Sequence, residues 1–302
     1  MRATLSKRGA GAALLLVLWA MLLLTGAVLG WARWVRQDLE RGTQAQLGME
    51  ATAMAHSGVA MALHPNVSRI SPQLQREIGA QLGYQVRMEG EGGRLNLNWL
   101  LAGEDPRKIQ LLKRWLEEMG LDFQEREVLV DCLLDYVDAD NLKRLNGVEE
   151  APGYRAPNRP FLSLDEVAKV PGSEALLRAP GWREMLTLYS DGPVDLSSAS
   201  PEVLRLLPGV GDDRVQRFVM FRNGRDGVLG TEDDMVLKSV EEVSLQFFGM
   251  NAKQSGQLKA LAMVKDPVVR ITARGNSGKV IRQVEVVVRK GGGNPAILYW
   301  NE

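Results

Sequence analysis

The sequence is poor in the side chains on which most hydrolases and disulfide-bonded domains depend. It holds one cysteine and two histidines among its 302 residues. A lone Cys132 excludes an intramolecular disulfide, and its apolar helical surroundings favour a buried structural thiol. A Ser-His-Asp or Cys-His catalytic site, or a histidine-based metal site, would have to use His56 or His64. We therefore expect that the protein is not an enzyme.

The sequence also lacks an excess of charge of either sign. Basic and acidic residues number 37 each, so the formal net charge is zero. Nothing in this balance attracts the chain as a whole to nucleic acid or to anionic lipid. Hydrophobic residues make up 45% of the chain, enough for a sizeable core and one or two domains.

An uncharged, largely apolar run extends from residue 9 to residue 32, directly after Lys7 and Arg8. As a helix it would reach roughly 36 Å, enough to cross a hydrocarbon core of about 30 Å. The apolar part of a secretory signal is shorter, roughly 7–15 residues. The run therefore favours a retained membrane helix over a signal peptide cleaved after Ala32. Basic residues flank both ends, so the positive-inside rule gives only a slight preference for a cytoplasmic N-terminus.

The helix is expected to continue well beyond the membrane, because Pro65 is the first residue that would end it. Small residues follow one of its faces, at Ala51, Ala55, Gly58 and Ala62. Small side chains allow a second backbone to approach closely, as packing on a partner helix requires. Packing of the same alanines on the chain's own domain explains the pattern equally well, and both interpretations stay open.

Strand-like alternation precedes and follows a long helical block. We expect a hairpin over residues 84–98 with its turn at 89–93, and further strands at 268–273, 279–289 and 296–300. The pattern predicts an α+β fold, in which a large all-helical domain is inserted between the strands of one antiparallel sheet behind the long N-terminal helix.

A short motif recurs inside the helical block, beginning at Ser163, Ser200 and Ser239. The first and third copies have glutamate three residues later, which predicts capping boxes, and the second has proline at the first helical position. These copies are typical of repeated helix–turn–helix units.

The second copy, residues 194–211, resembles the helix-hairpin-helix of DNA-binding and competence proteins. In those proteins a Gly-x-Gly turn offers backbone N–H groups to a DNA phosphate. Here Asp212 and Asp213 follow Gly211 at the same helix start and would repel a phosphate. We therefore interpret the turn as structural. A membrane-anchored DNA-binding protein of the competence type is the alternative function.

Two acidic clusters are candidate calcium sites, because calcium takes about 6–8 oxygen ligands in irregular geometry. One lies at a predicted helix end and comprises Asp131, Asp135, Asp138 and Asp140, and further oxygen ligands follow closely in the loop at Asn141, Asn146, Glu149 and Glu150. The other lies in the glycine-rich loop 224–234 and comprises Asp226, Glu232, Asp233 and Asp234. Neither matches an EF-hand, and solvated loops whose aspartates cap turns are the competing interpretation.

Taken together and in this order, three segments resemble the minor pseudopilin K family of type II secretion systems. They are residues 8–19, residues 129–140 with the following Asn146-Gly147, Tyr154 and Asn158-Arg159-Pro160, and residues 195–211.

The resemblance implies that prepilin peptidase removes a leader after Gly9 or Gly11 and that the new N-terminus is methylated. Most pilins carry glutamate at the fifth mature position, where this chain has Leu14 or Leu16. The K subunit generally lacks that glutamate. It is therefore expected at the pseudopilus tip, where it primes and caps assembly for the export of folded proteins.

The resemblance also implies a pilin-like sheet, structural calcium in the head, and association with minor pseudopilins I and J, other pseudopilins and the inner-membrane assembly platform. The protein would span the inner membrane once, with its N-terminus cytoplasmic and its head periplasmic. No nucleic acid is expected as a partner. The expected divisions are a leader (1–11), a transmembrane and spine helix (12–64), the first part of the sheet (65–104), the inserted helical domain (105–262) and the C-terminal strands (263–302).

Overall fold

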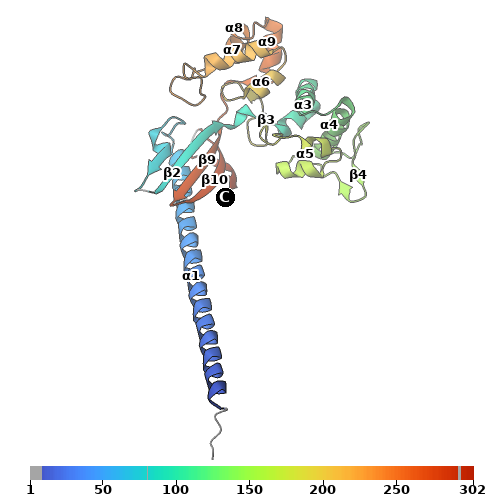
Figure 1. Cartoon of the computed structure of the whole chain (residues 1–302). Helices are drawn as coiled ribbons and strands as arrows, with labels where there is room; N and C mark the ends of the chain where they lie inside the picture. Colours follow the sequence, from blue (N-terminus) through green and yellow to red (C-terminus); the bar gives the residue numbers. More distant parts are fainter. Residues whose placement is uncertain (1–8, 80, 292–293) are drawn as a thin grey trace, which may run out of the picture.

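A computed structural model describes residues 9–79, 81–291 and 294–302. Most of the expected leader, residues 1–8 with Lys7 and Arg8, lies outside these ranges. The first described element is helix α1 (Gly9–Leu63), so both candidate cleavage glycines are helical. The helix projects from the head as a long rod (Figure 1).

Helix α1 ends at Leu63, two residues before Pro65, as the sequence predicts. It is the one helix of the described chain that is long and apolar enough to cross a membrane. Its most apolar 18-residue window has a mean hydropathy of 2.4, and none of that window is buried by the rest of the chain. The side chains from Leu14 to Trp34 therefore need an apolar environment supplied from outside.

The C-terminal half of α1 lies on a five-stranded antiparallel sheet in the described chain, with strand order β1-β2-β9-β10-β11. Its strands are β1 (Gln75–Glu77), β2 (Leu82–Gly90), β9 (Val268–Ser277), β10 (Val280–Arg289) and β11 (Ala296–Asn301). The sequence separates β2 from β9 by the whole helical head, yet the two strands pair along nine residues, from Leu82↔Ser277 to Gly90↔Val269. The expected α+β fold with an inserted helical domain is confirmed.

The predicted hairpin over residues 84–98 is wrong in its second strand. After β2 the chain makes a 3-10 turn, η2 (Glu91–Gly93), and leaves the sheet. The short strand β3 (Leu95–Asn96) then pairs in parallel with β6 (Leu186–Thr187). Asn96 accepts a hydrogen bond from the Trp99 N–H and caps helix α2 (Leu97–Leu101), so the alternation of leucine and asparagine there belongs to a helix start.

The head consists of short helices around one large apolar core, which includes Trp115, Phe218 and Phe248. In Figure 1 its elements gather in two groups, one around α3 to α5 and one around α6 to α9. Besides α2 the helices are α3 (Pro106–Glu118), α4 (Phe123–Val137), α5 (Glu174–Arg178), α6 (Pro201–Leu206), α7 (Asp212–Arg222), α8 (Val240–Gln246) and α9 (Ala252–Lys259). Two-residue ladders join β4 (Glu150–Ala151) to β5 (Tyr154–Arg155), and β7 (Val194–Asp195) to β8 (Ala262–Met263).

The repeated serines are helix caps, although the capping boxes are incomplete. Ser200 and Ser239 accept hydrogen bonds from the N–H groups three residues later and start α6 and α8. Ser163 starts a 3-10 helix, η4 (Leu164–Lys169). The predicted reciprocal bonds are wrong: Glu166 instead accepts from Arg159 and from the Leu162 N–H. Among the described residues, Glu242 likewise returns no bond to Ser239.

A buried ion-pair network joins the head to the sheet. Glu91, at the start of the insertion, is fully buried and lies 2.5 Å from Nη2 of Arg270 on β9 and 2.8 Å from Nη1 of Arg94. Its Oε1, the oxygen that pairs with Arg270 Nη2, also accepts a hydrogen bond from the Thr187 hydroxyl. The Glu91 carboxylate accepts hydrogen bonds from both the sheet and the head. Glu91 therefore fixes the point at which the insertion leaves β2.

The small-residue stripe of α1 faces the chain's own sheet. Ala51, Ala55 and Ala62 are fully buried, and a Cβ added to Gly58 would lie 2.8 Å from Val86 of β2. On the facing strand, a Cβ added to Gly275 would lie 2.0 Å from the Ala51 carbonyl oxygen. The stripe is therefore not a surface for a partner helix. The closely approaching backbone is that of β9.

We predict that Gly275→Ala lowers the free energy of unfolding of the full-length protein in detergent by about 3 kcal/mol, because backbone atoms on both elements must move apart. Denaturant titration followed by circular dichroism measures the change. Gly256→Ala in α9 is the control, since nothing lies within 4 Å of its added Cβ. It should leave stability unchanged or raise it by up to about 1 kcal/mol. Equal stability of Gly275→Ala and wild type would contradict the packing described here.

Candidate functional site

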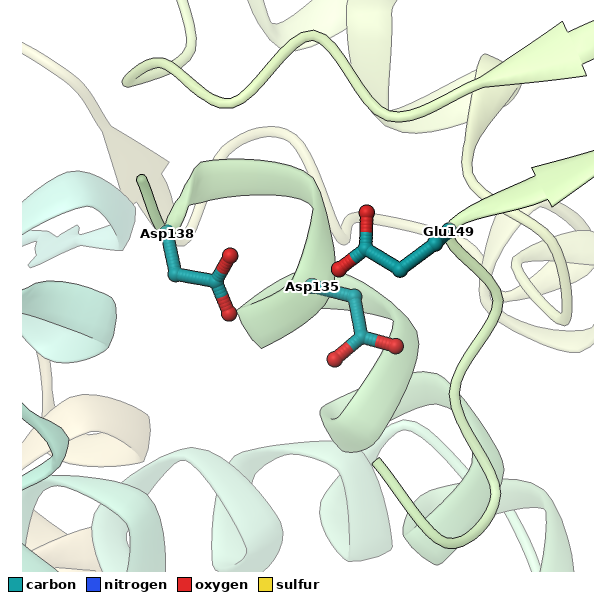
Figure 2. A group of neighbouring side chains, drawn as sticks. All are labelled: Asp135, Asp138 and Glu149. Carbon is teal, nitrogen blue, oxygen red and sulfur yellow. The ribbon is translucent and has the colours of Figure 1, made fainter. Parts of the chain in front are cut away.

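Three carboxylates meet at the C-terminal end of α4. Asp135 lies in its last turn, Asp138 is its C-cap, and Glu149 returns to them from just before β4. Each offers one oxygen, and the three oxygens lie within 4.8 Å of one another (Figure 2). Asp135 and Asp138 were predicted as ligands. Glu149 was expected only among the oxygen-bearing residues that follow the acidic run.

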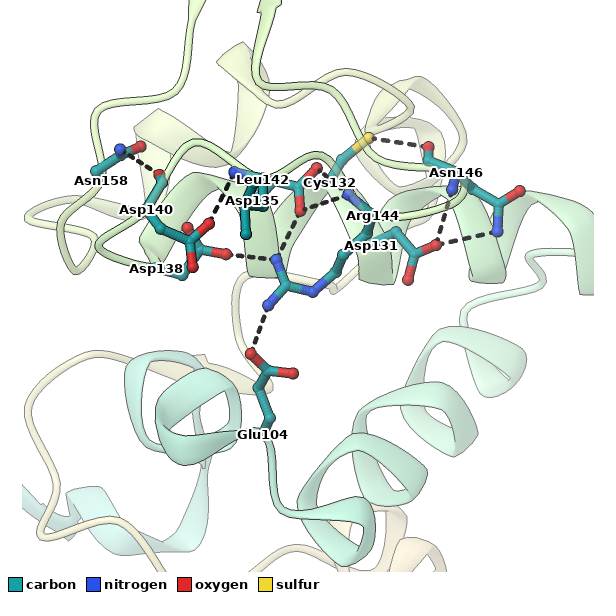
Figure 3. A network of polar contacts seen from close by, with 10 residues as sticks. All are labelled: Glu104, Asp131, Cys132, Asp135, Asp138, Asp140, Leu142, Arg144, Asn146 and Asn158. Atoms are coloured by element: carbon teal, nitrogen blue, oxygen red, sulfur yellow. Dashed lines mark hydrogen bonds and ion pairs between the residues drawn. The ribbon is translucent and has the colours of Figure 1, made fainter.

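The guanidinium of Arg144 contacts Asp135 and Asp138 of this cluster, and Glu104 (Figure 3). Its Nη1 is 2.6 Å from Asp135 Oδ1 and also donates to Asp138, and its Nη2 is 2.5 Å from Glu104 Oε1. Burial acts to lower the pKa of Arg144, but the hydrogen bonds to Asp138 and Asp135 outweigh it and raise that pKa. Arg144 is therefore the permanent cation of the cluster, and it compensates the fully buried Asp135.

The cluster still holds more negative charge and more acceptor atoms than Arg144 satisfies. Asp138 Oδ1, Glu149 Oε1 and the Tyr154 hydroxyl are buried and have no hydrogen-bond partner in the described chain. Burial, followed by the charges of Asp135 and Asp138, raises the pKa of Glu149. Buried acceptors of this kind commonly bind an ion or ordered water, so the donor set suits a hard cation.

The other acidic residues of this region stabilise the loop after α4. Asp140 accepts a hydrogen bond from the Leu142 N–H at 2.7 Å, and Asp131 accepts two from Asn146 at 3.0 Å. Gly147 is required here, because an added Cβ would lie 1.9 Å from Asp135 Oδ2. Cys132 is buried below the loop, and burial raises the pKa of its thiol to about 11, as expected for a structural cysteine.

The carboxylates of the loop 224–234 are directed at the loop's own backbone. Asp233 accepts from the N–H groups of Arg225 and Asp226, and Asp226 accepts from that of Val228. Asp234 pairs with Arg69 at 2.5 Å and accepts from the Gly230 N–H, while its Oδ1 is buried without a partner. Glu232 of this loop is exposed. Among the described residues, three carboxylates come within 4.8 Å of one another at the end of α4 but not in this loop.

Charged side chains of the protein itself lie at the turn between α6 and α7 and interact with one another and with its backbone. Asp212, the first residue of α7, lies 3.0 Å from Nε of Arg205, and Arg214 donates to the carbonyl of Gly209. A phosphate at this helix start would meet Asp212 and Asp213. Nothing in the turn supports the DNA-binding alternative.

We predict that Arg144→Met lowers the free energy of unfolding by about 3–5 kcal/mol, because it leaves buried Asp135 without a compensating charge. Thermal and denaturant unfolding of the full-length chain in detergent measure the loss. The neighbouring Lys143→Met, which changes an exposed side chain, is the control and should stay within about 0.5 kcal/mol of wild type. Similar losses of unfolding free energy in the two variants would contradict the role of Arg144 as the charge that compensates Asp135.

Comparison with known proteins connects this cluster to a family. Residues 93–179, which include α4, Arg144 and Glu149, match the family model for type II secretion system (T2SS) protein K. The type II secretion system protein K of Pseudomonas aeruginosa strain PAO1 is 32% identical over 162 residues. That alignment covers 49% of this chain and 47% of the relative, so the matched part spans about half of the relative's length.

The fold has a solved counterpart. In the crystal structure of the GspK-GspI-GspJ complex from the enterotoxigenic Escherichia coli type 2 secretion system, one chain aligns with a TM-score of 0.61 at 14% identity. The alignment covers 88% of this chain and 98% of that chain. At that identity the similarity concerns the fold. The matched domain and the related sequence make this chain similar to type II secretion system protein K over part of its length, and the solved structure shares its fold.

Proposed function

We propose that the protein is the minor pseudopilin K at the tip of a type II secretion pseudopilus, where it primes and caps the filament for the export of folded proteins. The observation that carries this proposal is the protein K domain at residues 93–179, inserted into a sheet that lies on a long membrane helix. The domain match supports the assignment to the family, and the long helix supports a role in assembly.

The position of the head supports a place at the tip. The head lies at the far end of the sheet from the free half of α1, and it is broader than the sheet (Figure 1). A subunit stacked above would meet this mass of short helices. Leu14 or Leu16 stands where most pilins have glutamate. The chain therefore lacks the acid with which a shaft subunit neutralises the amine of its neighbour.

The proposed role requires assembly and no chemical reaction. The apolar half of α1 crosses the inner membrane with its N-terminus cytoplasmic and its head periplasmic. Prepilin peptidase cuts after Gly9 or Gly11, and the assembly platform then extracts the helix. Leaving the bilayer re-exposes Leu14 to Trp34, so partner helices must cover them. The similar fold was solved as a complex with GspI and GspJ, which supports the I and J subunits as those partners.

We further propose that calcium binds in the head at Asp135, Asp138 and Glu149. Two buried oxygens without partners and a surplus of negative charge support this assignment. Bound calcium would neutralise that surplus and fix the loop that follows α4. Arg144 would have to share the carboxylates with the calcium ion or move aside, and either would lower the affinity of the site for calcium.

If the function is right, co-expression of the affinity-tagged chain with pseudopilins I and J of the same organism yields a complex containing all three. Deleting the chain should abolish export of folded exoproteins, and restoring it should recover export. An unrelated single-pass membrane protein, carrying the same tag, controls for non-specific capture. Failure to bind I and J, together with retardation of a DNA duplex at physiological salt, would instead support the DNA-binding alternative.

If the calcium site is right, adding Ca²⁺ raises the melting temperature of the protein. Glu149→Gln and Asp138→Asn should each weaken calcium binding at least about tenfold, measured by calorimetry. Asp226→Asn is the control and should leave the affinity unchanged, because its carboxylate caps a turn. The opposite pattern would assign the ion to the loop 224–234.

A further inference from the structure

The two edges of the five-stranded sheet differ in length and in composition. One edge is β1, whose three residues, Gln75–Glu77, are all polar and exposed. A short edge strand with charged side chains resists pairing with other chains. The other edge is β11, whose six residues, Ala296–Asn301, carry no charge. Its apolar side chains Ile297, Leu298 and Trp300 are 53%, 37% and 40% exposed. The sheet is therefore protected at β1 and open at β11.

A β-bulge directs two of these apolar side chains to the side of the sheet on which α1 lies. Ile297 is opposite Val288 and Trp300 is opposite Val286, and the pairing register shifts between the two pairs. Residues three positions apart therefore share one face, whereas in a regular strand they would lie on opposite faces. Both valines are fully buried in the core between α1 and the sheet. The apolar surface thus continues from this core to the open edge.

Contacts on both faces hold β11 in place. On the face away from α1, Tyr299 lies against Tyr189 of the head, with 5.4 Å between ring centroids. On the α1 side, the ring of Trp300 meets His56 edge to face at 5.6 Å, and His56 lies 3.0 Å from Glu302. The strand is therefore fixed before a partner arrives, which lowers the cost of ordering on binding. Among the described strands, only β10 lies beside it, so the backbone groups of its other edge are free to pair.

The direction of α1 argues against a second copy of this chain as the partner. Near its first contact with the sheet, Ala51 lies against Gly275, the residue paired with Arg282. Near its end, the Ala62 carbonyl accepts a hydrogen bond from Lys290. Helix α1 therefore runs in the direction of β10, and β11 runs opposite to it.

Antiparallel pairing is the more stable arrangement of two strands. Two copies of this chain that paired antiparallel through β11 would have their α1 helices pointing in opposite directions. The apolar halves of both helices could not then enter the same membrane from the same side. The strand that pairs with β11 therefore belongs to a different protein.

We propose that the free edge of β11 pairs with an extended strand of a neighbouring pseudopilin, the I or J subunit, and that this strand continues the sheet. The inference rests on the proposed function and specifies one surface by which the protein meets its neighbour. Free N–H and C=O groups along an edge require an extended backbone opposite them, because the backbone of a helix is already paired. The added strand is antiparallel to β11 and runs in the direction of α1. Its apolar side chains cover Ile297 and Trp300.

Hydrogen–deuterium exchange tests the pairing on the unaltered protein. The full-length chain is measured in detergent, alone and in complex with pseudopilins I and J of the same organism. Amides of residues 296–301 should exchange at least about tenfold more slowly in the complex, because free N–H groups gain acceptors. Amides of residues 75–77, on the other edge, should be unchanged. Equal exchange of residues 296–301 in the two samples would overturn the proposal.

A lysine on the open edge tests the apolar contact. Ile297→Lys should weaken binding of I and J at least about tenfold, because edge lysines oppose strand addition. Gln75→Lys makes the matched change on the opposite edge and should leave the affinity unchanged. Both replaced side chains are exposed, so both variants should melt at the wild-type temperature. Equal affinity of Ile297→Lys and wild type would contradict the proposal.

Disulfide scanning tests whether the partner segment is a strand. With Ile297→Cys in the full-length chain, single cysteines are moved along the partner segment that benzophenone crosslinking at the same position identifies. The native Cys132 is buried and stays in place. Disulfides should recur at every second residue of the partner, the period of a strand. Recurrence at every third or fourth residue would show a helix and overturn the proposal.

The remaining outcomes separate the surface from the function. If I and J bind the chain but exchange at 296–301 does not slow, the surface is wrong and the proposed function stands. If β11 becomes protected in the chain alone at high concentration, a second copy pairs there and the choice of partner is wrong. If the wild-type chain fails to bind I and J at all, the proposed function fails and this inference with it.

Discussion

The close contact between the backbones of α1 and β9 is the constraint on which the rest of the structure depends. Gly275 has no side chain, and Ala51 and Ala55 have almost none, so a helix and a strand meet at backbone distance. This contact fixes α1 to the sheet rigidly, and through the sheet to the head. A force on the membrane helix would therefore be transmitted to the sheet, which suits the role proposed for the protein at a filament tip.

The head also contains buried charged side chains that are held in ion pairs. Glu91 joins the insertion to the sheet through Arg270 and Arg94, and Arg144 holds the carboxylates at the end of α4. Removing one member of such a network leaves a buried charge uncompensated, which costs more than the intact network contributes. A divalent cation at Asp138 and Glu149 would extend the same arrangement, since those oxygens still lack partners.

Features that depend on neighbouring residues could be predicted from the sequence. Helix α1 ends just before Pro65, and Ser200 and Ser239 cap their helices. Strands β9 to β11 form where apolar and polar residues alternate in the sequence. Features that depend on distant partners could not. Leu95 reads as the return strand of a hairpin, but its partner is Leu186, far along the chain. The sequence places Glu149 close behind the acidic run, but which of these carboxylates meet depends on the loop through Gly147, which folds back on Asp135. No sequence pattern identifies Arg144 as the cation that pairs with Asp135 and Asp138.

If the protein is a processed pilin-class subunit, as proposed, its mature N-terminus shows it most directly. Mass spectrometry of the membrane-bound protein from its native cell should find a chain that starts at Ala10 or Ala12 and is N-methylated. An intact Met1 would contradict the claim and indicate a plain membrane anchor. A start near Arg33 would indicate a secreted protein, and the pseudopilin assignment would fall.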